Sequence, residues 1–169
     1  KGNPALLSAV FSFELRNESA MVLNQAPFTQ TNGPLAWAGK RYDMGDEASR
    51  QALADDVSVA WANAVLAPLK ARYPDVLFAI DVYSFKMVGR TAPGFTLRDR
   101  SRDVRIPLNF AALAERSTCD YLDYHFYMHR IQDDSVSGDW EANKKSVRFD
   151  EVRAACRKAG KPLVLGEFG

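Results

Sequence analysis

The chain has 169 residues, 47% of them hydrophobic, and a formal net charge of +1 at pH 7. This is the composition of one globular domain with enough length for a good core. The balanced charge argues against nucleic acid as a main partner, because nucleic-acid binding usually needs a basic surface. No apolar run approaches the roughly 18 residues of a membrane span, so we expect no membrane partner. The first residues, Lys1-Gly2-Asn3-Pro4, do not look like a signal peptide.

Four short apolar segments predict β-strands. Each is rich in Val, Leu, Ile, Phe or Tyr and has the length of a strand. They cover residues 7–15, 76–83, 121–127 and 162–168.

Three segments between these strands have the three-and-four spacing of amphipathic helices. They cover residues 47–74, with Pro68 near the end, 106–117, with Pro107 near the start, and 146–160, which closes on Gly160. Proline is common in a first helical turn and glycine just after a helix. Alternating strands and helices predict a parallel sheet with helical crossovers.

Three long connections, 19–46, 85–104 and 128–145, each follow a predicted strand. Loops of this length in a compact domain are usually functional or disordered. All three would lie at the carboxyl end of the sheet, where α/β proteins place their sites.

The two faces of the predicted strands differ. One face is apolar throughout and suits packing against helices, whereas the other becomes polar toward the carboxyl end, as in Asp81, Asp123 and His125. On the last strand, we place Leu163, Leu165 and Glu167 on this polar face. An open doubly wound sheet would favour apolar residues on both faces. The pattern therefore favours a closed barrel with outer helices.

Polar residues converge at the strand ends. Two interpretations account for them: a barrel interior filled by salt bridges, or a site. We assign Glu14, Arg16, Asp81 and Asp123 to the interior, with Glu14 and Arg16 as an ion pair. Glu18 and Glu167 end two different strands without an obvious basic partner, and an unpaired buried carboxylate tends to mark function. Asn17 is out of phase with Glu18, so both reach one pocket only if the strand end curls, as at a bulge.

Three short segments of the chain resemble motifs of a known enzyme family. "ELRNES" (14–19) is similar to the fourth-strand motif of clan A glycoside hydrolases, "HFY" (125–127) to their sixth-strand His-x-Tyr, and "PLVLGEFG" (162–169) to their seventh-strand motif. The closest resemblance is to glycoside hydrolase family 5, the cellulase and mannanase family. The three motifs occur in the family's order and are separated by helical segments, so the resemblance spans nearly the whole chain. One departure is Ser19, which stands where the family often has proline.

The resemblance implies roles for individual residues. Glu18 would be the general acid/base and Glu167 the nucleophile of a retaining glycosidase that cleaves a β-linked glycan. Asn17 would bind the sugar 2-hydroxyl, Tyr127 would hold the nucleophile, and His125 would contact the substrate or the acid/base. Such enzymes hold the two carboxyl groups about 5–5.5 Å apart.

The resemblance also implies that residues 1–169 are one catalytic-domain fragment of a (β/α)8 TIM barrel. It would cover strands four to seven, with the first three strands and the eighth absent, since a full barrel needs about 250 residues. The fragment by itself is expected to be inactive and to aggregate or dimerise through its open sheet edges. The family resemblance slightly favours a secreted or periplasmic location.

Several aromatic residues, one histidine and both cysteines lie outside these motifs. Trp37 and Trp140, and less strongly Phe28, Tyr42 and Phe85, either stack on sugar rings or pack the long loops. No cofactor and no metal are expected. His125 and His129 are four residues apart, which on a strand is about 13 Å, too far for one ion. Cys119 and Cys156 are expected to be buried free thiols.

The rival interpretation is a non-catalytic module, either a carbohydrate-binding barrel or an unrelated parallel α/β domain.

Overall fold

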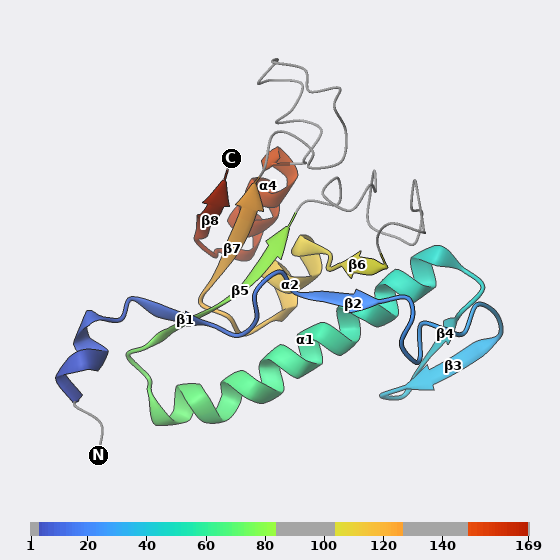
Figure 1. The fold of residues 1–169 in the computed structure, drawn as a ribbon, viewed down its shortest axis with the longest axis horizontal. Coiled ribbons are helices and arrows are strands. Elements are labelled where there is room, and N and C mark those ends of the chain that lie inside the picture. The colour runs from blue at the N-terminus through green and yellow to red at the C-terminus, as the bar shows by residue number, and fades with distance from the viewer. Residues whose placement is uncertain (1–3, 84–103, 127–148, 169) are drawn as a thin grey trace.

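A computed structural model describes residues 4–83, 104–126 and 149–168 (Figure 1). The predicted connection 128–145, and all of 85–104 except Val104, therefore lie outside the described residues. The elements are η1 Pro4–Ala9, β1 Ser12–Glu14, β2 Ala20–Val22, β3 Pro34–Trp37, β4 Lys40–Asp43, α1 Glu47–Arg72, β5 Leu77–Tyr83, β6 Arg105–Pro107, α2 Phe110–Arg116, β7 Tyr121–Phe126, α4 Phe149–Ala159 and β8 Leu163–Phe168.

The main sheet has four strands in the order β1-β5-β7-β8, and all three pairings are parallel. The sheet is curled, and the chain alternates between strands and helices along it (Figure 1). The prediction of a parallel α/β fold is confirmed. The predicted strands 76–83, 121–127 and 162–168 correspond to β5, β7 and β8.

The prediction of a first strand over 7–15 is largely wrong. Residues 4–9 form the short 3-10 helix η1, and β1 has three residues. The partner strand explains the difference, because β5 begins at Leu77, which lies opposite Ser12. Among the described residues, the segment before Ser12 has no neighbouring strand in this sheet to pair with, so nothing holds it extended.

The core lies between one face of the sheet and the helices. Side chains of β5 and β7 on this face are nearly or fully buried, and they pack against α1, α2 and α4. The sheet contributes Phe78, Ile80, Val82, Leu122 and Tyr124, and the helices contribute Val59, Ala62, Leu66, Phe110, Leu113, Ala114, Val152, Ala155 and Cys156. Cys119 also belongs to this core, and both thiols are free and buried, as predicted.

The helix boundaries follow local capping signals. Asp46 caps α1 by accepting a hydrogen bond from the Ser49 N–H at 2.7 Å, and α1 continues through Pro68 to Arg72. Gly160 follows α4 with a φ of 67°, the left-handed conformation that glycine adopts easily. The helices predicted over 47–74 and 146–160 are therefore present, the second from Phe149 within the described residues. None of the described helices is long and apolar enough to cross a membrane.

The third predicted helix, 106–117, begins later than expected. Arg105–Pro107 is instead strand β6, which pairs antiparallel with β2, and α2 begins after its cap residue Asn109. Pro107 lies in this strand because Ala20–Val22 offers a partner there, which local sequence does not reveal. The connection 19–46 also contains the hairpin β3–β4, which turns at Ala38 and Gly39 with φ values of 48° and 77°.

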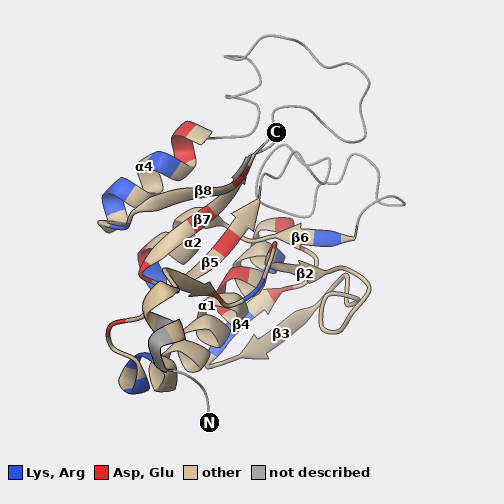
Figure 2. Cartoon of the chain, turned by 60° about the vertical axis from the view of Figure 1, so that its left-hand side comes forward, with Lys and Arg blue, Asp and Glu red and all other residues tan. Residues whose placement is uncertain are grey.

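The opposite face of the sheet is polar, and no described helix covers it. It carries Asp81 on β5 and Asp123 and His125 on β7, in agreement with the predicted alternation. Figure 2 shows acidic positions on β5, β7 and β8. This polar inner face and the curl of the sheet are those expected of part of a barrel.

Candidate functional site

Three side chains meet at the carboxyl end of the sheet. Glu18 lies in the turn after β1, His125 near the end of β7, and Glu167 near the end of β8. Nδ1 of His125 lies 3.4 Å from Oε1 of Glu18 and 3.3 Å from Oε2 of Glu167. One ligand atom from each of the three residues lies within 4.8 Å of the other two. The structure therefore brings together Glu18 and Glu167, which the sequence predicted to share a pocket.

The turn after β1 directs Glu18 into this cluster. Glu18 has a φ of 44°, which is unusual for a residue with a side chain. The turn is held by Asp81, whose Oδ1 accepts a hydrogen bond from the Ser19 N–H at 3.1 Å. Arg105 on β6 approaches from the other side, with Nη1 3.4 Å from Oε2 of Glu18. An arginine and a buried aspartate thus fix the first carboxylate.

Asn17 lies in the same turn, but its side chain is exposed. Among the described residues it forms no hydrogen bond with Glu18, His125 or Glu167. The chain does curl after β1, as the out-of-phase spacing required, and the curl directs Glu18 inward and leaves Asn17 at the surface. Its predicted contact with a sugar 2-hydroxyl stays a prediction.

A β-bulge in β8 positions Glu167. Asp123 pairs with Val164 and His125 with Glu167, so one residue of β7, Tyr124, lies opposite two residues of β8, Leu165 and Gly166. Leu163 consequently packs against the helical core, while Glu167 lies beside His125. The prediction that Leu163 and Glu167 share one face is wrong, because simple alternation does not hold across a bulge.

Gly166 makes this bulge possible. Its N–H donates a hydrogen bond to Oδ1 of Asp123 at 2.6 Å. A Cβ added at Gly166 would lie 2.5 Å from that oxygen and 2.6 Å from Cγ of Asp123. The Asp123 carboxylate therefore fills the space that any other side chain at position 166 would need, and the contact fixes the residue before Glu167.

His125 is the most enclosed member of the cluster, with 2% of its side chain exposed. Its Nε2 lies 3.5 Å from Oδ2 of Asp81, which is fully buried. Burial raises the pKa of the Asp81 carboxyl, although hydrogen bonds from the backbone N–H groups of Glu18 and Ser19 oppose this effect. The imidazole thus has a carboxylate on each of its two nitrogen sides.

The predicted ion pair between Glu14 and Arg16 is absent from the described residues. Glu14 instead shares a hydrogen bond with Asp123, and this contact, together with burial and nearby carboxylates, raises the pKa of Glu14 to about 8. Strand β1 ends at Glu14, so Arg16 no longer follows its alternation and turns toward α1. A strand that ended later would have kept both side chains on one face.

The predicted aromatic contacts have different outcomes. Trp37 is half-buried and packs against the hydrophobic cluster that holds the β3–β4 hairpin on α1. Phe28 and Tyr42 are buried in that cluster, with 4% and 5% exposed, so they pack the loop. Tyr127, Phe85 and Trp140 lie outside the described residues, and the predicted roles of Tyr127 and Trp140 stay predictions.

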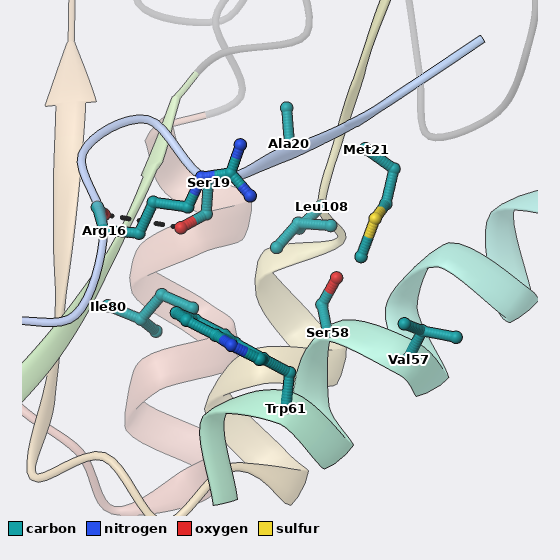
Figure 3. A pocket seen from close by; sticks show the side chains of 9 residues that line it. All are labelled: Arg16, Ser19, Ala20, Met21, Val57, Ser58, Trp61, Ile80 and Leu108. Carbon is teal, nitrogen blue, oxygen red and sulfur yellow. Dashed lines mark hydrogen bonds between the residues drawn. The ribbon is translucent and has the colours of Figure 1, made fainter. Parts of the chain in front are cut away.

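A pocket of about 150 Å³ lies near the cluster but on the helix side of the turn (Figure 3). Arg16 and Trp61 point into it, and most of its lining is apolar. None of the three clustered side chains lines this pocket. The chemistry therefore belongs to the inner face of the sheet and not to this pocket.

The sequence did not reveal several of the residues that build the site. The strand alternation assigned Asp81 to interior packing, and no motif pointed to Arg105. Glu18, His125 and Glu167 bring metal-binding atom types together, whereas the histidine pair visible in the sequence is His125 with His129, which lies outside the described residues. One signal of the bulge was visible in the sequence. Gly166 immediately precedes Glu167 in a predicted strand, and isolated glycines in strands often mark bulges.

Comparison with known proteins found no matching family model, no similar curated protein and no similar solved structure.

Proposed function

We infer that the chain carries the two catalytic carboxylates of a retaining glycoside hydrolase that acts on a β-linked glycan. One observation carries this proposal. Glu18 and Glu167, far apart in the sequence, place carboxylate oxygens within 4.8 Å of each other beside a buried histidine. Retaining enzymes need two carboxyl groups about 5–5.5 Å apart, whereas inverting enzymes need roughly 6.5–9.5 Å to admit a water.

The resemblance of "RNE" and "GEFG" to family motifs assigns the roles. Glu167 attacks the anomeric carbon and forms a glycosyl-enzyme ester, while Glu18 donates a proton to the departing oxygen. Glu18 then removes a proton from water, and the water displaces Glu167. Net retention follows, because each of the two displacements inverts the anomeric carbon.

The surroundings of the two carboxylates support this cycle. Arg105 approaches Glu18, and His125 lies between the two glutamates. The exposed fraction of the side chain is 22% for Glu18 and 41% for Glu167, so a substrate can reach both.

The proposal includes a finer statement about the fold. We propose that the four parallel strands form half of an eight-stranded barrel. The curl of the sheet, the helices on its apolar face and the polar inner face support this. In such a barrel Tyr127 and Trp140 would contribute to substrate binding together with Asn17, whereas Trp37 packs the β3–β4 hairpin.

Azide rescue in the full-length protein tests the two roles. Glu18→Ala should still form the glycosyl-enzyme from an activated aryl β-glycoside, because that leaving group needs no proton. It should then stall, and added azide should release the β-glycosyl azide. Glu167→Ala should yield the α-azide, since azide then attacks from the side of the missing nucleophile.

Glu115→Ala is the matched control, because Glu115 pairs with Lys158 on the helical side of the molecule. This variant should keep wild-type turnover. An α-azide from Glu18→Ala, or near wild-type turnover on a natural glycan by Glu18→Ala or Glu167→Ala, would contradict the assignment.

A further inference from the structure

The Nδ1 atom of His125 lies between two carboxylates. It faces carboxylate oxygens of both Glu18 and Glu167, at 3.4 and 3.3 Å. With a proton, Nδ1 has one N–H for two acceptors. Without a proton, its lone pair faces two negative groups. A metal ion between the three atoms would satisfy all of them.

The distances suit a small divalent ion. Zn²⁺ binds histidine nitrogen and carboxylate oxygen at about 2.0–2.2 Å, so two ligand atoms at a tetrahedral angle lie about 3.3–3.6 Å apart. The two distances from Nδ1 fall at the lower end of this range. The third edge of this triangle of ligand atoms, from a carboxylate oxygen of Glu18 to one of Glu167, is at most 4.8 Å long. Rotation of the Glu167 side chain, which is 41% exposed, can shorten this edge.

Asp81 supplies an independent observation. It is fully buried, and among the described residues its Oδ2 has no hydrogen-bond partner. This oxygen points at the cluster, 3.5 Å from Nε2 of His125. Histidine ligands of metals almost always donate their second N–H to a carboxylate or carbonyl, which fixes the ring. A metal at Nδ1 would leave the proton on Nε2, where Asp81 is placed to accept it.

The electrostatic surroundings favour a cation. Asp123 adds a carboxylate to the same inner face, next to Asp81. Arg105 approaches this cluster through Glu18. A concave face with an excess of carboxylates attracts divalent ions.

We propose that Glu18, His125 and Glu167 bind one divalent transition-metal ion, with Asp81 orienting His125. One imidazole and two carboxylates suit Zn²⁺ and leave a fourth position open. Mg²⁺ and Ca²⁺ prefer six or more oxygen ligands and fit less well. The site does not depend on the proposed glycosidase activity. Where both hold, the bound ion inhibits hydrolysis, because it occupies both catalytic carboxylates.

Metal titration of the chelator-treated full-length protein tests the proposal. Calorimetry with Zn²⁺ should give one ion per chain, with much weaker binding of Mg²⁺. Co²⁺ should give the intense visible bands of four-coordinate cobalt without a thiolate charge-transfer band. A thiolate band would locate the ion at Cys119 or Cys156 and overturn the proposal, as would no Zn²⁺ binding.

Variants locate the ion. Glu167→Gln keeps the size of an accessible side chain and should lose Zn²⁺ binding while remaining folded by circular dichroism. Asp81→Asn should weaken binding about 10–100-fold, the usual effect of removing an outer partner. His129→Ala is the matched control and should bind as the wild type does. Unchanged affinity in Glu167→Gln or Asp81→Asn, or lost binding in His129→Ala, would refute the proposed site.

Discussion

Substitution of Gly166 by alanine tests how the bulge in β8 is held. The new Cβ would lie 2.5 Å from Oδ1 of Asp123 and 2.6 Å from its Cγ, well inside van der Waals contact. Either Asp123 must move and lose its 2.6 Å hydrogen bond from the Gly166 N–H, or β8 must move away from β7.

The magnitude follows from these two costs. Overpacking costs about 1–3 kcal/mol, and a hydrogen bond to a charged group contributes about 1.5–3 kcal/mol. Because the structure can respond in either way, we expect Gly166→Ala to lower the free energy of unfolding by about 1–3 kcal/mol. Urea unfolding followed by circular dichroism measures this change.

A double-mutant cycle isolates the cause. In an Asp123→Ala background the clash disappears, so Gly166→Ala should cost less than about 1 kcal/mol. Gly39→Ala is a control, because no atom lies within 4 Å of its added Cβ and its cost comes from a φ of 77°. That cost, about 1–2 kcal/mol, should be equal in both backgrounds. An equal cost of Gly166→Ala in the two backgrounds would refute the role of Asp123.

Three further predictions concern stability and assembly. The pKa of Glu14 is about 8 in the folded chain and 4.5 in the unfolded chain, so the folded state binds more protons and stability should fall as the pH rises between these values. Glu14→Gln should remove this part of the pH dependence of thermal unfolding, and an unchanged profile would contradict the pKa. Leu122→Ala, in the buried core, should cost about 2–5 kcal/mol in urea unfolding. Leu165→Ala, which is 39% exposed, should cost clearly less, and equal costs would contradict the assigned faces. Because the described edges of β1 and β8 lack neighbours, residues 1–169 expressed alone should self-associate, and a monomer in sedimentation would count against this.

Local sequence patterns were sufficient to predict the helices and strands that form the core. β5, β7 and β8 are short, largely apolar segments, and α1 and α4 have helical spacing with clear ends at Asp46 and Gly160. The alternation of β5 and β7 also predicted which side chains meet the helices. These features depend on residues that are close together in the sequence, so the sequence alone was enough to predict them.

Pairing between distant segments was not predictable in the same way. β6 exists because Arg105–Pro107 lies against Ala20–Val22, and β1 is short because β5 begins opposite Ser12. The bulge at Gly166 depends on the Asp123 carboxylate, which comes from another strand. Each of these features is fixed by a contact that the local sequence does not contain.

The candidate site combines both kinds of information. Glu18 and Glu167 were found because each ends a predicted strand without an obvious basic partner, and motif resemblance gave them roles. The position of His125 between them, and of Asp81 behind it, required the register of three strands. Sequence therefore indicated the two candidate carboxylates, and the structure showed the groups that contact them.

Trapping of the covalent intermediate tests the central claim most directly. The full-length protein is incubated with an activated aryl 2-fluoro-β-cellobioside and, separately, with the corresponding mannoside, because fluorine slows both steps and a good leaving group restores the first. Peptide mass mapping should then locate one glycosyl group on Glu167 and none on Glu18. A label on Glu18 would reverse the proposed roles. Turnover of the parent β-glycosides with inversion of the anomeric carbon would contradict the double displacement itself.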